Sequence, residues 1–291
     1  MKTFFHTIIL LIFFASCSDD FDVNRYYKMS GNKKIVHFSI DDCSQIFKNL
    51  TEHKYESIFD EYILGKLKKL HDKYGLKVCL YTFYNVGSFC LADVPDYYAE
   101  QFKQNADWLK VAPHAKSGDI LADSVVRYYD MVKILEHITS TISLTNTARL
   151  EKFQGGLEIL SAENTPLCLL TADSDNRKSY YLEDSLCRKM EIEEYFHDTI
   201  NNKFFYKTDF RLDYPDDFAN LLAVNATDDC IIFFTHEWLL LETKPRLNIC
   251  AMVKQYYNTN KIWENLERVC MYVCMYEHEF KTDLDGKYYG K

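Results

Sequence analysis

Several acidic, histidine and arginine residues stand at the ends of apolar runs that are typical of buried strands. They are Asp41, Asp42, His114, Arg149, Asp173, Asp175 and His236. In parallel α/β proteins, reactive side chains gather at the carboxyl ends of the strands. A carboxylate and imidazoles can bind a divalent cation that acidifies a water molecule, while a second acid accepts the proton and a histidine protonates the leaving group. This set of residue types therefore indicates metal-assisted hydrolysis.

The elements that would position these residues alternate between strands and helices. Apolar runs predict strands over residues 35–40, 77–83, 108–114, 148–153, 166–171 and 231–235. Apolar residues at helical spacing predict helices over 58–74, 97–106, 121–138 and 261–276, and Gly75 is expected to end the first of them. This alternation predicts parallel βαβ units in an α/β protein, either as a barrel or as an open doubly wound sheet. Residues 180–214 contain further strand-like segments, which predict a small hairpin-like excursion.

The composition excludes several classes of protein. The 291 residues carry a formal net charge of −9, which argues against a broad nucleic-acid surface because such a surface needs clustered Lys and Arg. Hydrophobic residues make up 47% of the chain, as in globular rather than disordered proteins. No CxxC pair occurs, so neither a zinc ribbon nor a thioredoxin-like redox site is indicated. No linker is evident after residue 30, and residues 34–291 are expected to form a single domain.

The N-terminal segment has the features of an export signal. Lys2 precedes an apolar run over residues 8–14, which is too short to span a bilayer as a stable helix. The following Phe-Ala-Ser-Cys resembles a bacterial lipobox, in which the cysteine, here Cys17, is lipidated and becomes the new N-terminus. We therefore expect a lipoprotein signal peptide at residues 1–16, a polar tether at 17–33, and an exported protein that a lipid holds at a membrane. The alternative is an ordinary cleaved signal with an incidental cysteine.

The motifs around the candidate residues resemble those of a known family. FSIDD (residues 38–42) resembles the first motif of the polysaccharide deacetylase superfamily, carbohydrate esterase family four. YGLKVCLYTF, WLKVAPHAKSGD, ARLEKF, LLTADSD and FFTHEW follow in the order of the family's later motifs. The resemblance spans roughly residues 34–240, which is most of the mature chain. It implies a distorted (β/α) barrel with a groove for sugar chains.

The resemblance also implies a metal centre and a base. Asp42 and His114 would hold a divalent metal ion, namely zinc, cobalt or nickel. Asp41 would be the general base that deprotonates water, and Arg149 would orient Asp41 through a charge-assisted hydrogen bond.

The remaining roles concern the leaving group and the substrate. His236 would be the general acid, and Asp173 would hold it protonated. The implied reaction removes acetyl groups from N-acetylated or O-acetylated sugars of a glycan, and the protein would be a hydrolase of carbon–nitrogen bonds other than peptide bonds. Trp238 could stack on a sugar ring or fill the core.

Two departures from the family pattern leave alternatives open. The second motif of the family has the form H-x-x-x-H, but Gly118 stands where the second histidine belongs, so Asp119 or Asp123 is the candidate for a third ligand. The third motif lacks the proline that usually follows its arginine. The chain could therefore be a catalytically degenerate glycan-binding protein at the cell surface, or a metal hydrolase that acts on a different amide.

Overall fold

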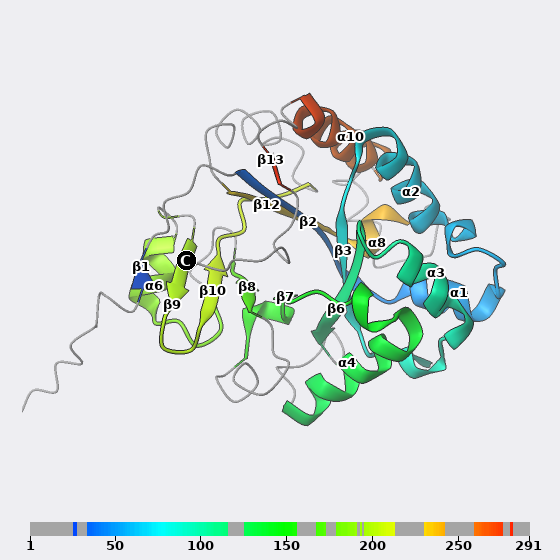
Figure 1. Cartoon of the computed structure of the whole chain (residues 1–291), viewed down its shortest axis with the longest axis horizontal. Coiled ribbons are helices and arrows are strands. Elements are labelled where there is room, and N and C mark those ends of the chain that lie inside the picture. Colours follow the sequence, from blue (N-terminus) through cyan, green and yellow to red (C-terminus); the bar gives the residue numbers. More distant parts are fainter. Residues whose placement is uncertain are drawn as a thin grey trace, which may run out of the picture.

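The computed structural model describes residues 26–27, 34–115, 125–155, 167–172, 179–190, 193, 195–212, 230–241, 259–275 and 280–281. Figure 1 shows two sheets with flanking helices, and β4 (Asn85–Val86) and β5 (Phe89–Cys90) add a short antiparallel pair. Among the described residues, no helix combines the length and the apolar character that are needed to cross a membrane.

The larger sheet consists of parallel strands in the order β11-β12-β2-β3-β6, with β13 also paired to β2. Its strands are β2 (Lys34–Cys43), β3 (Val78–Phe83), β6 (Leu109–Ala115), β11 (Phe210–Arg211), β12 (Cys230–His236) and β13 (Phe280–Lys281). All residues of β3 are buried, as expected for a strand that is covered on both faces. Because the strands are parallel, the carboxyl ends of β2, β3, β6 and β12 meet at one edge of the sheet.

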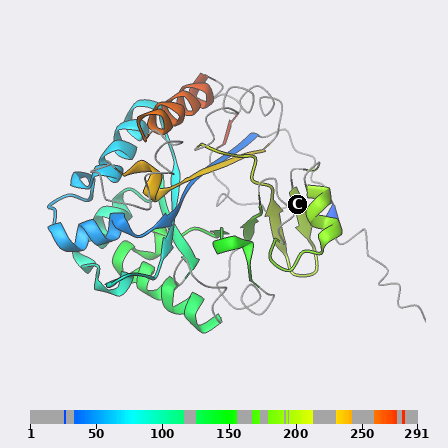
Figure 2. The ribbon, with the colours of Figure 1, turned by 180° about the vertical axis from the view of Figure 1, so that it is seen from behind.

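Helices cover the outer face of the larger sheet, as the two opposite views in Figures 1 and 2 show. They are α1 (Gln45–His53), α2 (Tyr62–Tyr74), α3 (Ala99–Gln104), α4 (Val125–Thr139), α8 (Glu237–Leu240), α10 (Thr259–Met275) and the 3-10 helices η1 (Ile58–Asp60), η2 (Leu91–Asp93), η3 (Asp96–Tyr98) and η4 (Thr141–Ser143). Buried side chains such as Ile40, Leu64 and Leu80 form one core between the sheet and the helices. Gly75 ends α2 with a φ of 70°, so the predicted helix stop is confirmed.

The smaller sheet has the order β1-β9-β10-β8-β7 and mixes parallel with antiparallel pairs. Its strands are β1 (Tyr26–Tyr27), β7 (Thr147–Ala148), β8 (Cys168–Leu170), β9 (Tyr195–Asp198) and β10 (Lys203–Tyr206). β9 and β10 form an antiparallel hairpin, which confirms the excursion predicted within residues 180–214. The strand-like pattern within residues 180–214 is wrong at residues 188–190, which end the helix α6 (Asp184–Met190). Leu186 and Met190 bury one face of this helix at helical spacing.

The inner faces of the two sheets pack on each other. One buried cluster joins residues of the larger sheet to residues of the smaller sheet, namely Cys79, Tyr81, Ala112, Cys168, Leu170 and Tyr206. Val111 of β6 forms a parallel bridge with Leu144, just before β7, and β11 follows β10 closely in the chain. The predicted α/β class is confirmed, and the arrangement is consistent with a distorted barrel whose strands are divided between two sheets.

The strand that was predicted over residues 148–153 is wrong beyond Ala148. β7 ends there, and the chain turns into the 3-10 helix η5 (Glu151–Phe153). Lys152 and Phe153 have φ values of 55° and 52°, which a strand does not allow. Leu150 and Phe153 are nevertheless buried, so an irregular segment with buried apolar residues produced a strand-like sequence pattern.

Candidate metal centre

Asp41 and Asp42 lie at the carboxyl end of β2, where the strand departs from regular geometry. The pairing with β3 shifts between Ile40 and Cys43, and Asp42 has a φ of 62°. Such irregularities redirect side chains, and they are common beside active sites. Asp41 is 3% exposed, whereas the side chain of Asp42 is 23% exposed. The two neighbouring carboxylates are thereby placed in different environments.

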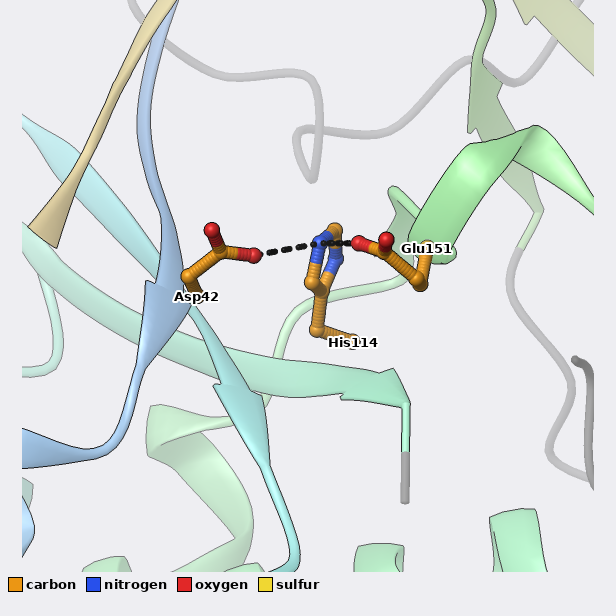
Figure 3. Close-up of side chains that lie close together, drawn as sticks. All are labelled: Asp42, His114 and Glu151. Carbon is orange, nitrogen blue, oxygen red and sulfur yellow. Dashed lines mark ion pairs between the residues drawn. The ribbon is translucent and has the colours of Figure 1, made fainter. Parts of the chain in front are cut away.

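Asp42 faces two residues from other elements, His114 near the end of β6 and Glu151 at the start of η5. His114 Nε2 lies 3.5 Å from Asp42 Oδ1 and 3.1 Å from Glu151 Oε2. One potential ligand atom from each residue lies within 4.8 Å of the others. Figure 3 shows the two carboxylates pointing toward the imidazole ring from opposite sides. Carboxylate oxygens and imidazole nitrogens are common metal ligands, so these three residues could hold a divalent ion.

The second ring nitrogen of His114 sets the direction in which the ring faces. Nδ1 forms a hydrogen bond with the backbone carbonyl of Arg149. A carbonyl only accepts, so Nδ1 donates and Nε2 is left to face Asp42 and Glu151. This is the usual arrangement of a metal-binding histidine. A lone pair on Nε2 between two carboxylates is unfavourable unless a positive charge lies among them, so the donor set fits a divalent cation.

A proton on His114 can satisfy the same two carboxylates in place of a cation. Burial alone would lower the pKa of His114, but its hydrogen bonds with Asp42 and Glu151 raise that pKa to about 10. Burial alone would raise the pKa of Asp42, but the hydrogen bond with His114 brings it below its usual value. A metal ion that binds at Nε2 must therefore displace a proton.

Asp41 is held by a separate set of hydrogen bonds. Arg149 Nε donates to Asp41 Oδ2 at 2.5 Å, and Ser39 Oγ donates to Asp41 Oδ1 at 3.1 Å. Arg149 is 1% exposed, its Nη1 donates to Thr208 Oγ1 at 2.7 Å, and its guanidinium carbon lies 3.8 Å from the centre of the Phe234 ring. These hydrogen bonds satisfy both oxygens of Asp41 and two of the three guanidinium nitrogens of Arg149, whereas the buried Nη2 has no hydrogen-bond partner among the described residues. The network therefore keeps one carboxylate fixed beside the candidate metal ligands.

His236 lies at the end of β12, directly opposite Asp41 in the pairing of β12 with β2. Arg211 Nη2 lies 3.2 Å from His236 Nδ1, and an arginine only donates, so Nδ1 accepts and a neutral ring carries its proton on Nε2. The Trp238 ring stacks on His236 with a centroid distance of 5.4 Å, and Trp238 Nε1 donates to Asp42 Oδ2 at 3.2 Å. Trp238 is 44% exposed, so the core-filling interpretation of this residue is wrong.

The structure brings six of the predicted site residues to one edge of the larger sheet. They are Asp41, Asp42, His114, Arg149, His236 and Trp238. Asp119, Asp123, Asp173, Asp175 and Cys17 lie outside the described residues, so their suggested roles stay predictions.

Sequence reasoning missed Glu151 and Arg211. Glu151 follows Arg149 by two residues in the segment that was taken for a strand, and the sequence analysis assigned it no role. The available signal was an acid close to the candidate arginine, in the motif that departs from the family pattern. Arg211 stands in a two-residue strand, β11, and no sequence signal separated it from other surface arginines.

No family model and no curated protein matches the chain. Among solved structures, it is similar to a peptidoglycan N-acetylglucosamine deacetylase (10% identity, 88% of this chain and 89% of the other, TM-score 0.43). It is also similar to the peptidoglycan deacetylase PdaC from Bacillus subtilis (11% identity, 87% of this chain and 89% of the other, TM-score 0.36). A third similar structure is a family 4 acetyl xylan esterase from Clostridium thermocellum in complex with a cobalt ion (14% identity, 86% of this chain and 88% of the other, TM-score 0.39).

Proposed function

We propose that this protein is a metal-dependent hydrolase that removes acetyl groups from N-acetylated or O-acetylated sugars of a glycan. The observation that carries the proposal is the placement of Asp42, His114 and Glu151 around one point, beside the separately held carboxylate of Asp41. Hydrolysis of an amide needs an electrophilic centre and a base within reach of the same water molecule. These residues offer both.

In this proposal, Asp42, His114 and Glu151 hold a divalent metal ion, which polarises the acyl carbonyl and acidifies water when it is bound. Asp41 accepts the proton of the attacking water. Its hydrogen bonds with Arg149 and Ser39 fix both carboxylate oxygens, so the base does not have to reorient during the reaction.

His236 is proposed as the proton donor to the leaving nitrogen of an amide or the leaving oxygen of an ester. Its Nε2 carries the proton of the neutral ring because Arg211 occupies Nδ1. In this state Nε2 can donate a hydrogen bond to the leaving group. Complete transfer of the Nε2 proton requires that Nδ1 gains a proton, because the ring would otherwise become an anion. Arg211 must therefore first move away from Nδ1. Asp173, which the family resemblance places next to His236, is the proposed partner for that proton. Trp238 is proposed to stack its exposed ring on a sugar.

The direct test is the release of acetate from N-acetylated oligosaccharides by the purified protein. We expect release to stop in the presence of a chelator and to return when zinc, cobalt, nickel or manganese is added. The variant Asp41→Asn should lose turnover but retain metal affinity, because Asp41 is not among the three residues whose donor atoms converge and both of its oxygens accept from Arg149 and Ser39. Metal uptake without acetate release from any acetylated glycan in a broad panel would overturn the proposal.

The degenerate glycan-binding alternative was motivated by the absence of a third metal ligand. Glu151 supplies a third donor atom, so no observation now favours that alternative.

We further propose that Cys17 is lipidated and that the lipid anchors the exported protein to a membrane, as its sequence context suggests. Mass spectrometry of the N-terminal peptide from membrane fractions should show a diacylated Cys17, and Cys17→Ala should release the protein from the membrane. An unmodified cysteine in the membrane-bound protein would contradict the proposal.

A further inference from the structure

The candidate metal centre is unusually rich in carboxylate. Asp42 and Glu151 contribute two negative oxygen donors, and His114 contributes one neutral nitrogen donor. Each carboxylate turns one oxygen to the centre and the other to a donor outside it. Asp42 Oδ2 accepts from Trp238 Nε1 at 3.2 Å, and Glu151 Oε1 lies 3.8 Å from Lys152 Nζ. Both carboxylates are therefore arranged to offer a single oxygen to the ion.

The charges at the site suit this donor set. Asp41 is paired with Arg149, which leaves the two negative charges of Asp42 and Glu151 to balance a divalent ion. Lys152 also lies near Glu151, but its side chain is half-exposed, so solvent screens its charge. His114 is 4% exposed and Arg149 is 1% exposed, so an unbalanced charge would be costly in this environment. A neutral side chain in place of Glu151 would leave the loaded centre with one excess positive charge.

The backbone also holds Glu151 in place. Lys152 and Phe153, which follow Glu151 directly, both have positive φ values. Residues other than glycine adopt positive φ values at a cost in energy. Such conformations persist where the surrounding structure enforces them, often at functional sites. The buried Phe153 lies 5.2 Å below the guanidinium of Arg149, which ties this turn to the centre.

From these observations we propose that Glu151 is the third protein ligand. Compared with a histidine at the same position, we propose that Glu151 shifts the metal preference of the centre from zinc toward manganese. Carboxylate oxygens suit harder cations such as Mn²⁺, whereas imidazole suits Zn²⁺, and replacing one nitrogen donor by a charged oxygen narrows the difference in affinity between the two ions. The inference rests on the metal centre of the proposed function but not on its substrate.

The test measures the dissociation constants of Zn²⁺ and Mn²⁺ on the full chain at fixed pH, by competition with a chelator and by electron paramagnetic resonance of Mn²⁺. In Glu151→Gln, both affinities should fall about 10- to 100-fold, as on loss of a group that holds or orients a metal ligand. In Glu151→His, the affinity for zinc should recover but that for manganese should not, so the zinc-to-manganese ratio should rise about tenfold or more. X-ray absorption should then show one more nitrogen neighbour around zinc.

The matched control is Glu100→Gln, which removes an exposed acid of α3 whose contacts are with Lys103 and Gln104. This variant should leave both affinities unchanged. If Glu151→Gln does not fold, Glu151→Asp keeps the charge and should retain the zinc-to-manganese affinity ratio of the original protein. Affinities within about twofold of the original in Glu151→Gln, or an unchanged metal ratio in Glu151→His, would overturn the inference.

Acetate release plays no part in these measurements. A protein that binds both metals as expected but cleaves no acetylated glycan would contradict the proposed function alone. An active, metal-dependent protein whose metal ratio ignores residue 151 would contradict this inference alone.

Discussion

The larger and the smaller sheet contribute to the candidate centre through different kinds of backbone. Asp41, Asp42, His114 and His236 stand at or near the ends of the strands β2, β6 and β12 in the larger sheet. Arg149, by contrast, follows the two-residue strand β7, and Glu151 lies in an irregular turn. The regular region places its residues through strand register, whereas the irregular region depends on buried side-chain contacts to hold its shape. Substitutions of those contacts should therefore be more damaging.

The largest effect is expected from Arg149→Gln in the irregular region. This change leaves the buried carboxylate of Asp41 without its charged partner, and breaking a buried pair costs about 3–5 kcal/mol of unfolding free energy. Urea denaturation monitored by circular dichroism measures the loss. The matched control, Arg188→Gln on the exposed face of α6, should change stability by less than about 0.5 kcal/mol. Equal effects of the two changes would show that the buried ion pair does not stabilise the irregular region.

The regular region has its own buried acid, Glu237, which accepts hydrogen bonds from the backbone N–H groups of Ser44, Gln45 and Ile46 at the start of α1. Burial raises the pKa of Glu237 to about 7, although these hydrogen bonds oppose the shift. A raised pKa in the folded state contributes stability that is fully present below the ordinary value near 4.5 and is lost as the pH rises through 7.

We therefore expect this residue to make the protein about 3 kcal/mol less stable at pH 8 than at pH 4.5. Urea denaturation at several pH values measures the effect, and Glu237→Gln should remove this part of the pH dependence. Glu100→Gln should keep the dependence of the original protein. An identical pH profile in Glu237→Gln would show that the carboxyl group does not titrate in this range.

A smaller effect is expected from Thr208→Val. The Thr208 hydroxyl accepts from Arg149 Nη1 and donates to the backbone carbonyl of Thr171, so the change removes a hydrogen bond to a buried charged group. Such bonds contribute about 1.5–3 kcal/mol, and chemical denaturation should show a loss of about 2 kcal/mol. Thr141→Val, which removes an exposed hydroxyl bonded to Glu136, is the control and should be nearly neutral. A neutral Thr208→Val would mean that Arg149 does not need this support.

The smallest effect is expected from Trp238→Phe at the exposed edge of the site. The change keeps an aromatic ring beside His236 but removes the indole N–H that orients Asp42. Stability should stay the same within about 0.5 kcal/mol, while metal affinity should fall about tenfold, as on loss of a partner that orients a ligand. Isothermal calorimetry measures the affinity. Unchanged metal binding would leave Trp238 with a role in substrate contact only.

The regular region was largely predictable from the sequence. The apolar runs IVHFSI and IIFFT mark β2 and β12, and parallel pairing then places His236 opposite Asp41. The left-handed conformation of Asp42 was not predictable, because it depends on a shift in the pairing between β2 and β3 rather than on local residue types.

The irregular region was predicted only in part. Arg149 was identified through a motif, but its segment was assigned to a strand because Leu150 and Phe153 are apolar. The turn at Lys152 and Phe153 is stabilised by contacts with distant parts of the chain, including the hydrogen bond from the Tyr180 backbone N–H to the Phe153 carbonyl. Local sequence patterns do not carry such contacts, and Glu151 was missed for this reason.

Arg149 contacts Asp41 with its side chain and the imidazole of His114 with its backbone carbonyl. A shift of this single peptide unit would therefore move Asp41 and tilt His114 at the same time. Mutations that change the turn at Lys152 and Phe153 should show strong epistasis with mutations at Asp41 or His114, because a shift of residue 149 alters the positions of both. Directed evolution of this protein should accordingly find its tolerated changes in residues around the segment 149–153 rather than within it. The backbone conformation at position 149 should be retained.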